Sequence, residues 1–385
     1  MDVSSVGVPW AAKRVRPHAA AGIAIALTGI ALVACALAAN QRWLDRHFLP
    51  SFLLLRRSYV LIETCVRLAI GMLGVTLVVV ARFAAARLTA RLLWRASQVA
   101  MAAALALGAS EVVLRHLHLR AAEWLIREEE PLRRSDPRLG WTFVPARTGH
   151  STVGGRTVDY AFDESGYRVR RADVPVDPER PTIVFAGESV MFGEGLNWEE
   201  SIPAQVGGRL GVQSANLAVH GFSTDQAYLR LQAELPRFRR PVAVVTLFMT
   251  ALFGRNLDDD RPHLGPGLVW LPAQQHARLL SLAGLLVPYR RDTTVEVGIA
   301  VTREVLRATV NLARERGATP LIVVPQFGRE QPPDELLRHR ILDETGLPYV
   351  PVETDPASHV RWDRHPNAAA AHVIADAIAA RLRGH

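Results

Sequence analysis

Cysteine is almost missing from this sequence of 385 residues. The two that occur, Cys35 and Cys65, both lie in the hydrophobic first third of the chain, and residues 66–385 contain none. The later part of the chain therefore folds without a disulfide, and it offers neither a cysteine-based metal site nor a thiol nucleophile.

Lysine is scarcer still, since Lys13 is the only one. Residues 1–135 contain 17 Lys and Arg against 8 Asp and Glu, whereas the remainder is close to neutral. The high pI of about 10.2 therefore comes from arginines that flank hydrophobic runs. The later part has no basic stripe with interleaved aromatic residues, so we predict no nucleic-acid partner.

Long hydrophobic runs occur only near the start, at Ala19–Ala39, Tyr59–Ala81 and Ala96–Leu114. The first is uncharged, long enough to cross a bilayer and long for the core of a cleaved signal peptide. The second is interrupted by Glu63 and Arg67, and the third carries Glu111. We predict that residues 1–115 form a membrane region with up to three transmembrane helices.

The arginines predict an orientation for these helices. Arg82, Arg87, Arg91 and Arg95 follow the second run, and the positive-inside rule places them and the N-terminus in the cytoplasm. With three crossings of the cell (inner) membrane, all residues after Arg115 are predicted to lie on its extracytoplasmic side. The connector at 41–58 is also rich in arginine, which argues against this orientation.

The rest of the chain is predicted to contain a connecting segment and a large α/β domain. Residues 116–180 are expected to form a stalk helix over Arg115–Arg134 and a small β extension with pieces at Arg156–Phe162 and Tyr167–Arg170. In residues 181–385 apolar strands alternate with helical patterns, which is typical of βαβ units. This alternation predicts a three-layer αβα domain with a parallel five-stranded sheet.

The predicted strands are Thr182–Ala186, Ser214–Val219, Val242–Phe248, Pro320–Pro325 and Tyr349–Val352, and the predicted helices are Glu199–Leu210, Thr224–Leu235, Val295–Arg316, Asp334–Thr345 and Ala368–Leu382. Capping-box spacing at Asn197 and Glu200, and at Ser223 and Gln226, predicts two helix starts. The stretch Gly254–Leu286 interrupts the alternation with a long loop and a short apolar helix. We interpret it as a lid or a docking surface.

A candidate nucleophile follows the first of these strands. Ser189 comes directly after Gly187 and Glu188, at the carboxyl end of the strand, where open α/β sheets place their chemistry. A capping serine in a tight turn is the alternative. Near the chain end, Asp363 and His365 supply a carboxylate and an imidazole within three residues. An ester-cleaving serine needs both groups.

These motifs resemble those of the SGNH/GDSL hydrolase family over about residues 181–383. Gly187-Glu188-Ser189 is similar to its first block, with glutamate in place of the usual aspartate. Asn216–Gly221 is similar to the second block, Gly254-Arg255-Asn256 to the third and Asp363–Ala368 to the fourth. Met191 stands where an α/β-hydrolase elbow has glycine, which disfavours that family.

The resemblance implies the flavodoxin-like SGNH hydrolase fold and a set of roles. Ser189 would attack an acyl carbonyl, His365 would move the proton and Asp363 would orient the imidazole. The alternative for Asp363 is to cap the last helix. The N–H groups of Ser189 and Gly221 and the Asn256 amide would form the oxyanion hole.

Other polar residues are given structural roles. We interpret His220 as structural, and Asp258, Asp259 and Asp260 as loop acids that pair with Arg255 and Arg261 rather than bind a metal. No cofactor is predicted.

The sequence therefore predicts a membrane-anchored SGNH-type serine esterase or O-acyltransferase. It would form an acyl-Ser189 intermediate on an ester of a cell-envelope glycan or lipid. The alternative is a non-catalytic envelope scaffold or glycan-binding module that keeps the same frame. The sequence predicts no particular protein partner.

Overall fold

The computed structural model describes residues 17–48, 56–84, 90–117, 120–124, 128–286, 289–361 and 363–384. Its contacts divide the chain into two compact units, residues 1–44 with 56–110, and residues 45–55 with 111–385. Parts of two predicted segments lie outside the described residues, namely 49–55 of the connector and 85–89 of the arginine-rich stretch.

The first unit is helical. Its helices are α1 (Pro17–Ala38), α3 (Arg56–Ala84) and most of α4 (Ala90–Leu114), and the short α2 (Gln41–His47) begins in it. Helices α1 and α3 pack against each other at two glycines. A Cβ atom on Gly29 would lie 2.6 Å from the carbonyl oxygen of Gly74, and the reverse distance is also 2.6 Å. Such close approach at small residues is common between membrane helices.

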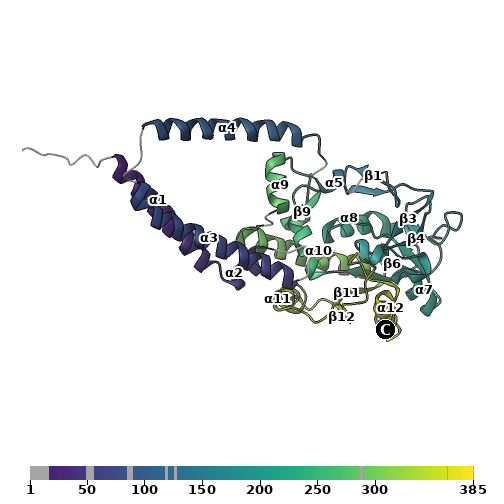
Figure 1. The fold of residues 1–385 in the computed structure, drawn as a ribbon. Coiled ribbons are helices and arrows are strands. Elements are labelled where there is room, and N and C mark those ends of the chain that lie inside the picture. Colours follow the sequence, from purple (N-terminus) through teal and green to yellow (C-terminus); the bar gives the residue numbers. More distant parts are fainter. Residues whose placement is uncertain are drawn as a thin grey trace, which may run out of the picture. The chain divides into compact units, whose positions relative to one another are not determined.

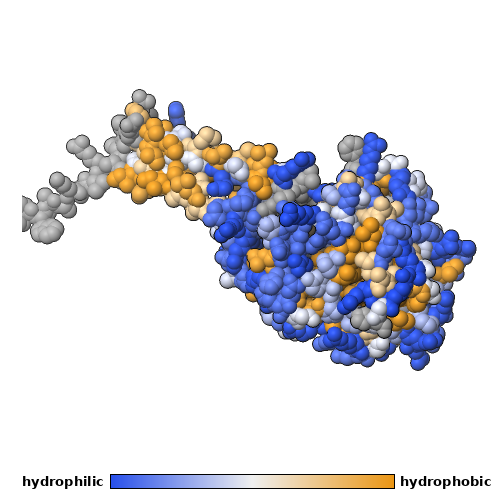
Figure 2. All heavy atoms as spheres, turned by 90° about the horizontal axis from the view of Figure 1, so that it is seen from below, coloured by the Kyte–Doolittle hydropathy of each residue, from blue (hydrophilic) through white to orange (hydrophobic). Residues whose placement is uncertain are grey.

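The surface of these helices is apolar (Figure 2). In the described part of the chain, Arg57–Ala81 and Trp94–Leu114 are long and apolar enough to cross a membrane. The bent pair Gly22–Ala38 and Gln41–His47 would make a third span if it acts as one. Two or three of the predicted runs are thus helices of suitable length and composition.

The second unit is built on one eight-stranded mixed sheet, with the order β12-β11-β8-β6-β7-β5-β4-β3. Figure 1 labels β3, β4, β6, β11 and β12 of this sheet. The strands are β3 (Arg147–Val153), β4 (Arg156–Phe162), β5 (Arg168–Val169), β6 (Thr182–Ala186), β7 (Gln213–Asn216), β8 (Pro241–Leu247), β11 (Thr319–Phe327) and β12 (Tyr349–Thr354). Strands β7, β6, β8, β11 and β12 pair in parallel, whereas β5 pairs antiparallel to β7.

The sheet therefore has more strands than the five predicted. The predicted β extension pairs with the free edge of β7 through Arg168 opposite Asn216, so β5, β4 and β3 continue the same sheet. An unpaired strand edge exposes N–H and C=O groups that an added strand satisfies.

Helices cover both faces of the sheet. On β6, Ile183 and Phe185 pack into a cluster that contains residues of α7 (Ile202–Leu210) and α12 (Ala368–Arg383). Val184 and Ala186 pack into a second cluster with α8 (Thr224–Glu234) and α10 (Asp292–Glu315), while α11 (Pro332–Ile341) packs against α10. Burial on both faces explains why β6 is apolar at four successive positions, Ile183 to Ala186, rather than at alternate ones.

Most predicted elements are present with ends shifted by a few residues, and both capping boxes are confirmed. The Asn197 box caps a 3-10 turn, η1 (Trp198–Glu200), and Ser201 caps α7 itself. The predicted long loop contains a hairpin of β9 (His263–Gly265) and β10 (Val269–Leu271), followed by α9 (Arg278–Leu286).

The predicted stalk helix is wrong in its extent. Within the described residues it is reduced to one turn, α5 (Ala121–Trp124). Pro131 lacks the N–H that a helix interior requires. From Arg133 the chain forms β1 (Arg133–Asp136), which pairs with β2 (Gly140–Phe143).

Candidate active site

Ser189 lies on a one-turn helix at the carboxyl end of β6. Glu188 caps this helix, α6 (Ser189–Phe192), because its side chain accepts the Val190 N–H. Gly193 ends the helix at φ +84°, a left-handed conformation that favours glycine. The turn is packed into the interior, and Ser189 is 1% exposed.

The structure brings Ser189, His365 and Asp363 together, although Ser189 and His365 are 176 positions apart. His365 Nε2 lies 2.8 Å from Ser189 Oγ, and His365 Nδ1 lies 2.6 Å from Asp363 Oδ1. The same carboxylate oxygen accepts the backbone N–H of His365 at 3.0 Å. This backbone bond folds the carboxylate back toward the imidazole despite their separation of two residues.

Capping of the last helix falls to another residue. Asn367 Oδ1 accepts the backbone N–H groups of Ala369 and Ala370 at the start of α12. The alternative role of Asp363 as that cap is therefore wrong. Its carboxylate is available to the imidazole.

The pKa values of His365 and Asp363 depend on each other. Burial by itself would lower the pKa of His365, but the Asp363 hydrogen bond and charge, with help from Glu194 and Glu188, raise that pKa above its ordinary value. Burial by itself would raise the pKa of Asp363, but its hydrogen bond and attraction to His365 lower it. The pair thus favours a carboxylate next to an imidazole that readily holds a proton.

Glu188 is a second acceptor for the serine hydroxyl. Ser189 Oγ donates to Glu188 Oε2 at 2.6 Å, and the same oxygen accepts the Val190 N–H at 3.2 Å. Arg255 is an ion-pair partner of this carboxylate, with its Nη1 3.8 Å from Glu188 Oε2. Among the described residues the other oxygen, Glu188 Oε1, is buried without a hydrogen-bond partner. The acid that replaces the usual aspartate is thus part of the site.

A second acid–imidazole pair lies beside the first, and the sequence reasoning missed its acid. His220 Nδ1 lies 2.9 Å from Glu194 Oε2, and the rings of His220 and His365 are 6.0 Å apart between centroids. Burial would raise the pKa of Glu194, but the charge and hydrogen bond of His220 lower it to about 2. The sequence signal that could have identified Glu194 is its position between Gly193 and Gly195, directly after the turn that carries Ser189.

Two buried side chains hold this turn in place. The Arg168 guanidinium donates to the carbonyl oxygens of Phe192 (2.8 Å) and Gly193 (2.7 Å) and also to that of Leu196. The Asn216 amide donates to Phe192 O at 3.2 Å. Burial lowers the pKa of Arg168 to about 10. The sequence motifs predict no role for Arg168.

The loop after β7 lies next to the nucleophile turn, because the Val219 N–H donates to Gly187 O at 3.2 Å. Gly221 follows in this loop with φ +81°. Among the described residues, neither the Ser189 N–H nor the Gly221 N–H donates to a protein acceptor. No described protein acceptor therefore competes for either N–H group.

Asn256 has different partners from those predicted. Its amide nitrogen donates to the hydroxyls of Thr224 and Thr302, each at 3.0 Å, and its oxygen accepts the Thr224 N–H at 2.9 Å. Both amide hydrogens are thus committed to threonines. The reason is its place in η3 (Thr250–Leu257), which packs against the start of α8 and against α10.

The acidic loop is paired with side chains of the same unit. Asp258 contacts Arg261 at 3.1 Å and Arg290 at 2.6 Å, and Asp259 contacts His276 at 2.9 Å. In the described ranges no group of three or more His, Cys, Asp or Glu side chains has the geometry of a metal site.

No family model and no curated protein matches this sequence. Solved structures similar to the chain include GDSL-type proteins and esterases, as the sequence motifs predict. A GDSL-like lipase from Bacteroides thetaiotaomicron has 13% identity and a TM-score of 0.32, covering 55% of this chain and 91% of its own. A carbohydrate acetylesterase family member from Sinorhizobium meliloti has 14% identity and a TM-score of 0.34, covering 53% and 98%. Because these scores are low, we base the function on the site geometry alone.

Proposed function

We propose that this protein is a membrane-anchored serine esterase that acts through an acyl-Ser189 intermediate. The observation that carries this proposal is the hydrogen-bonded series Ser189–His365–Asp363, with distances of 2.8 and 2.6 Å. A serine hydroxyl, an imidazole and an orienting carboxylate in this order form the constellation used for acyl transfer.

The reaction begins with a neutral His365 that carries its proton on Nδ1, toward Asp363. Nε2 then accepts the Ser189 proton while Oγ attacks the ester carbonyl carbon. The negative charge that develops on the carbonyl oxygen is bound by the N–H groups of Ser189 and Gly221. As the intermediate collapses, imidazolium returns the proton to the departing alkoxide. Water, activated by the same imidazole, then releases the acid and regenerates Ser189.

The proposed substrate is an ester of a cell-envelope glycan or lipid. Helices α1, α3 and α4 support anchoring because of their length and apolar surface. The arginine pattern favours an extracytoplasmic location for the later unit. In this scheme residues 1–115 form the membrane region, 116–180 the connecting segment and 181–385 the catalytic domain.

The test uses the full chain in detergent micelles with a fluorophosphonate probe and with p-nitrophenyl acetate. We expect labelling of the wild type and its loss in Ser189→Ala, with hydrolysis falling by about 10⁴-fold or more. His365→Ala should lose activity to a similar extent. Ser281→Ala, on α9, is the matched control and should retain both signals.

Equal labelling of Ser189→Ala and wild type would refute the nucleophile. Absence of labelling in the wild type, under conditions where a serine esterase reacts, would favour the non-catalytic scaffold. Measuring released acid against ester formed on an added sugar separates hydrolysis from O-acyl transfer.

A further inference from the structure

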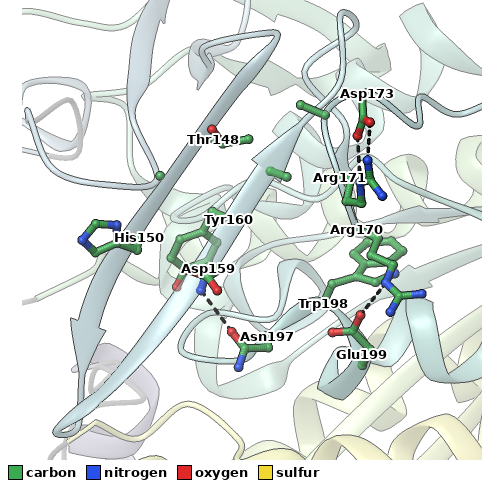
Figure 3. Close-up of a pocket in the computed structure, with 13 residues that line it drawn as sticks. Thr148, His150, Asp159, Tyr160, Arg170, Arg171, Asp173, Asn197, Trp198 and Glu199 are labelled. Carbon is green, nitrogen blue, oxygen red and sulfur yellow. Dashed lines mark hydrogen bonds and ion pairs between the residues drawn. The ribbon is translucent and has the colours of Figure 1, made fainter.

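A cavity separate from Ser189, His365 and Asp363 opens at the β3 end of the sheet in the second unit (Figure 3). Its volume is about 880 Å³, and strands β3 and β4, the segment after β5 and the turn η1 line it. Ser189, His365 and Asp363 are not among its lining residues. Binding pockets for small molecules typically have volumes of about 300–1,000 Å³.

The lining combines charged and polar side chains with the apolar surfaces of Trp198, Ala161 and Ala172. Trp198 at the start of η1 is partly exposed, and no described residue accepts a hydrogen bond from its indole N–H. The other ring, Tyr160, is 1% exposed, and its hydroxyl already accepts the Gly195 N–H. Pockets for apolar ligands are lined mainly by hydrophobic side chains. This cavity instead fits a ligand with one apolar face and many hydroxyls, which describes a sugar ring.

The charges in the cavity are nearly balanced. Arg170 pairs with Glu199 at 2.8 Å, and Arg171 pairs with Asp173 through two contacts of 2.9 and 2.5 Å. The Asp159 carboxylate has no hydrogen-bond or ion-pair partner among the described residues. The cavity therefore has no uncompensated cation for an anionic ligand and one free carboxylate that can accept hydroxyl protons.

Trp198 and Asp159 are held in a fixed relation to each other. Asn197, next to Trp198, accepts the Asp159 N–H at 3.0 Å. Its own N–H donates to Glu200, which also binds Arg156 on β4 at 2.8 Å. Hydrogen bonds and an ion pair thus hold η1, which carries Trp198, against β4, which carries Asp159. Pre-organisation of this kind reduces the entropic cost of binding.

We propose that this cavity binds a neutral oligosaccharide. The face of one sugar ring stacks on Trp198, and hydroxyl groups donate to the Asp159 carboxylate. Thr148 and His150 on β3 border the same space and offer further hydrogen-bonding groups. Binding here requires no acyl transfer, so it is independent of the proposed function.

The experiment is isothermal titration calorimetry on the full chain with Ser189→Ala, in a zwitterionic detergent that contains no sugar. The probes are cellohexaose, mannohexaose and chitohexaose, with a heparin-derived hexasaccharide as the anionic comparison. We expect at least one neutral hexasaccharide to bind, and Trp198→Ala to weaken it by about tenfold or more. Trp270→Ala, at a partly exposed tryptophan outside the cavity, should bind as the parent does.

A second variant protects the test against misfolding. Thr148→Arg places a long side chain in the cavity from an exposed strand position, and it should also weaken binding. Unchanged affinity in both variants would overturn the proposal, as would no neutral binding at roughly millimolar ligand. Tighter binding of the anionic probe would overturn it too. Fluorophosphonate labelling of Trp198→Ala with Ser189 intact tests the esterase separately.

Discussion

The hydroxyl of Ser189 has one proton and two acceptors within reach, Glu188 Oε2 at 2.6 Å and His365 Nε2 at 2.8 Å. When His365 is protonated, its Nε2–H points at Oγ, and the serine proton turns to Glu188. When His365 is neutral, Nε2 can accept that proton. In the proposed mechanism, the charge of the His365 imidazole therefore decides whether Ser189 can be activated.

The consequence is a defined pH dependence. Because acidic neighbours raise the pKa of His365, the inactive imidazolium persists above the ordinary midpoint of 6.5. We expect kcat/KM for p-nitrophenyl acetate to rise with pH through a midpoint above 6.5. A profile that is flat from pH 5 to pH 8, roughly the range in which histidine titrates, would contradict this assignment.

Glu194 supplies part of that shift, since its charge raises the pKa of His365. Glu194→Gln should move the midpoint of kcat/KM to lower pH. Glu179→Gln, at an exposed acid on the surface, is the matched control and should leave the midpoint in place. A Glu194→Gln midpoint equal to that of the wild type would show that this acid does not act on the imidazole.

At the scale of elements, the nucleophile turn depends on a strand that sequence reasoning treats as peripheral. The two-residue strand β5 carries Arg168, whose guanidinium binds carbonyl groups of the turn and lies 4.8 Å from the ring centroids of both Tyr160 and Phe192. A buried cation is tolerated only where such acceptors surround it.

Arg168→Met should therefore destabilise the turn and the domain together. We expect a loss of about 3 kcal/mol or more in the free energy of unfolding, because the carbonyl groups of Phe192, Gly193 and Leu196 all lose their charged donor inside the domain. Urea denaturation followed by circular dichroism measures this loss. Arg171→Met, at an exposed arginine close by, should change stability little. Equal effects of the two substitutions would refute the role of Arg168.

Substitution of Asn256 distinguishes a structural role of its amide from a role as an oxyanion donor. If its amide holds Thr224 and Thr302, Asn256→Ala should cost about 1–3 kcal/mol of stability and leave kcat within about tenfold of the wild type. Loss of an oxyanion donor would instead lower kcat by about 10²–10³-fold. Steady-state kinetics at a temperature where both proteins are folded gives the answer.

At the scale of the molecule, the apolar surface lies on the helices of the first unit and the candidate active site lies in the second. The helices of the first unit expose large side chains such as Leu27 (60%), Met72 (66%) and Leu105 (68%). Exposure of this extent over helices of 20 or more residues suits lipid rather than water.

We therefore expect the full chain, expressed in bacteria, to stay with the membrane fraction after washing with high salt and with alkaline carbonate. Detergent should release it, because apolar contact with lipid rather than charge holds it there. Immunoblotting of the fractions measures the distribution. Release of most of the protein by carbonate would contradict integral insertion.

The sequence by itself determined the main strands and helices of residues 181–385 and the order of Ser189, Asp363 and His365 along the chain. The short apolar run Ile183–Ala186 predicted β6. Gly187 marked the end of this strand and so placed Ser189 there. Asp363 and His365 are close neighbours in the chain, so their pairing could also be predicted from the sequence. These are local patterns of propensity and spacing, which a chain carries wherever it folds.

Only the tertiary structure decided what each site residue touches. Arg168 reaches Gly193 across 25 positions, and Asn256 reaches Thr302 across 46. The sheet extended from five expected strands to eight because the edge of β7 was open to pairing. Such contacts depend on which surfaces meet after folding, and the burial of polar groups then selects their partners.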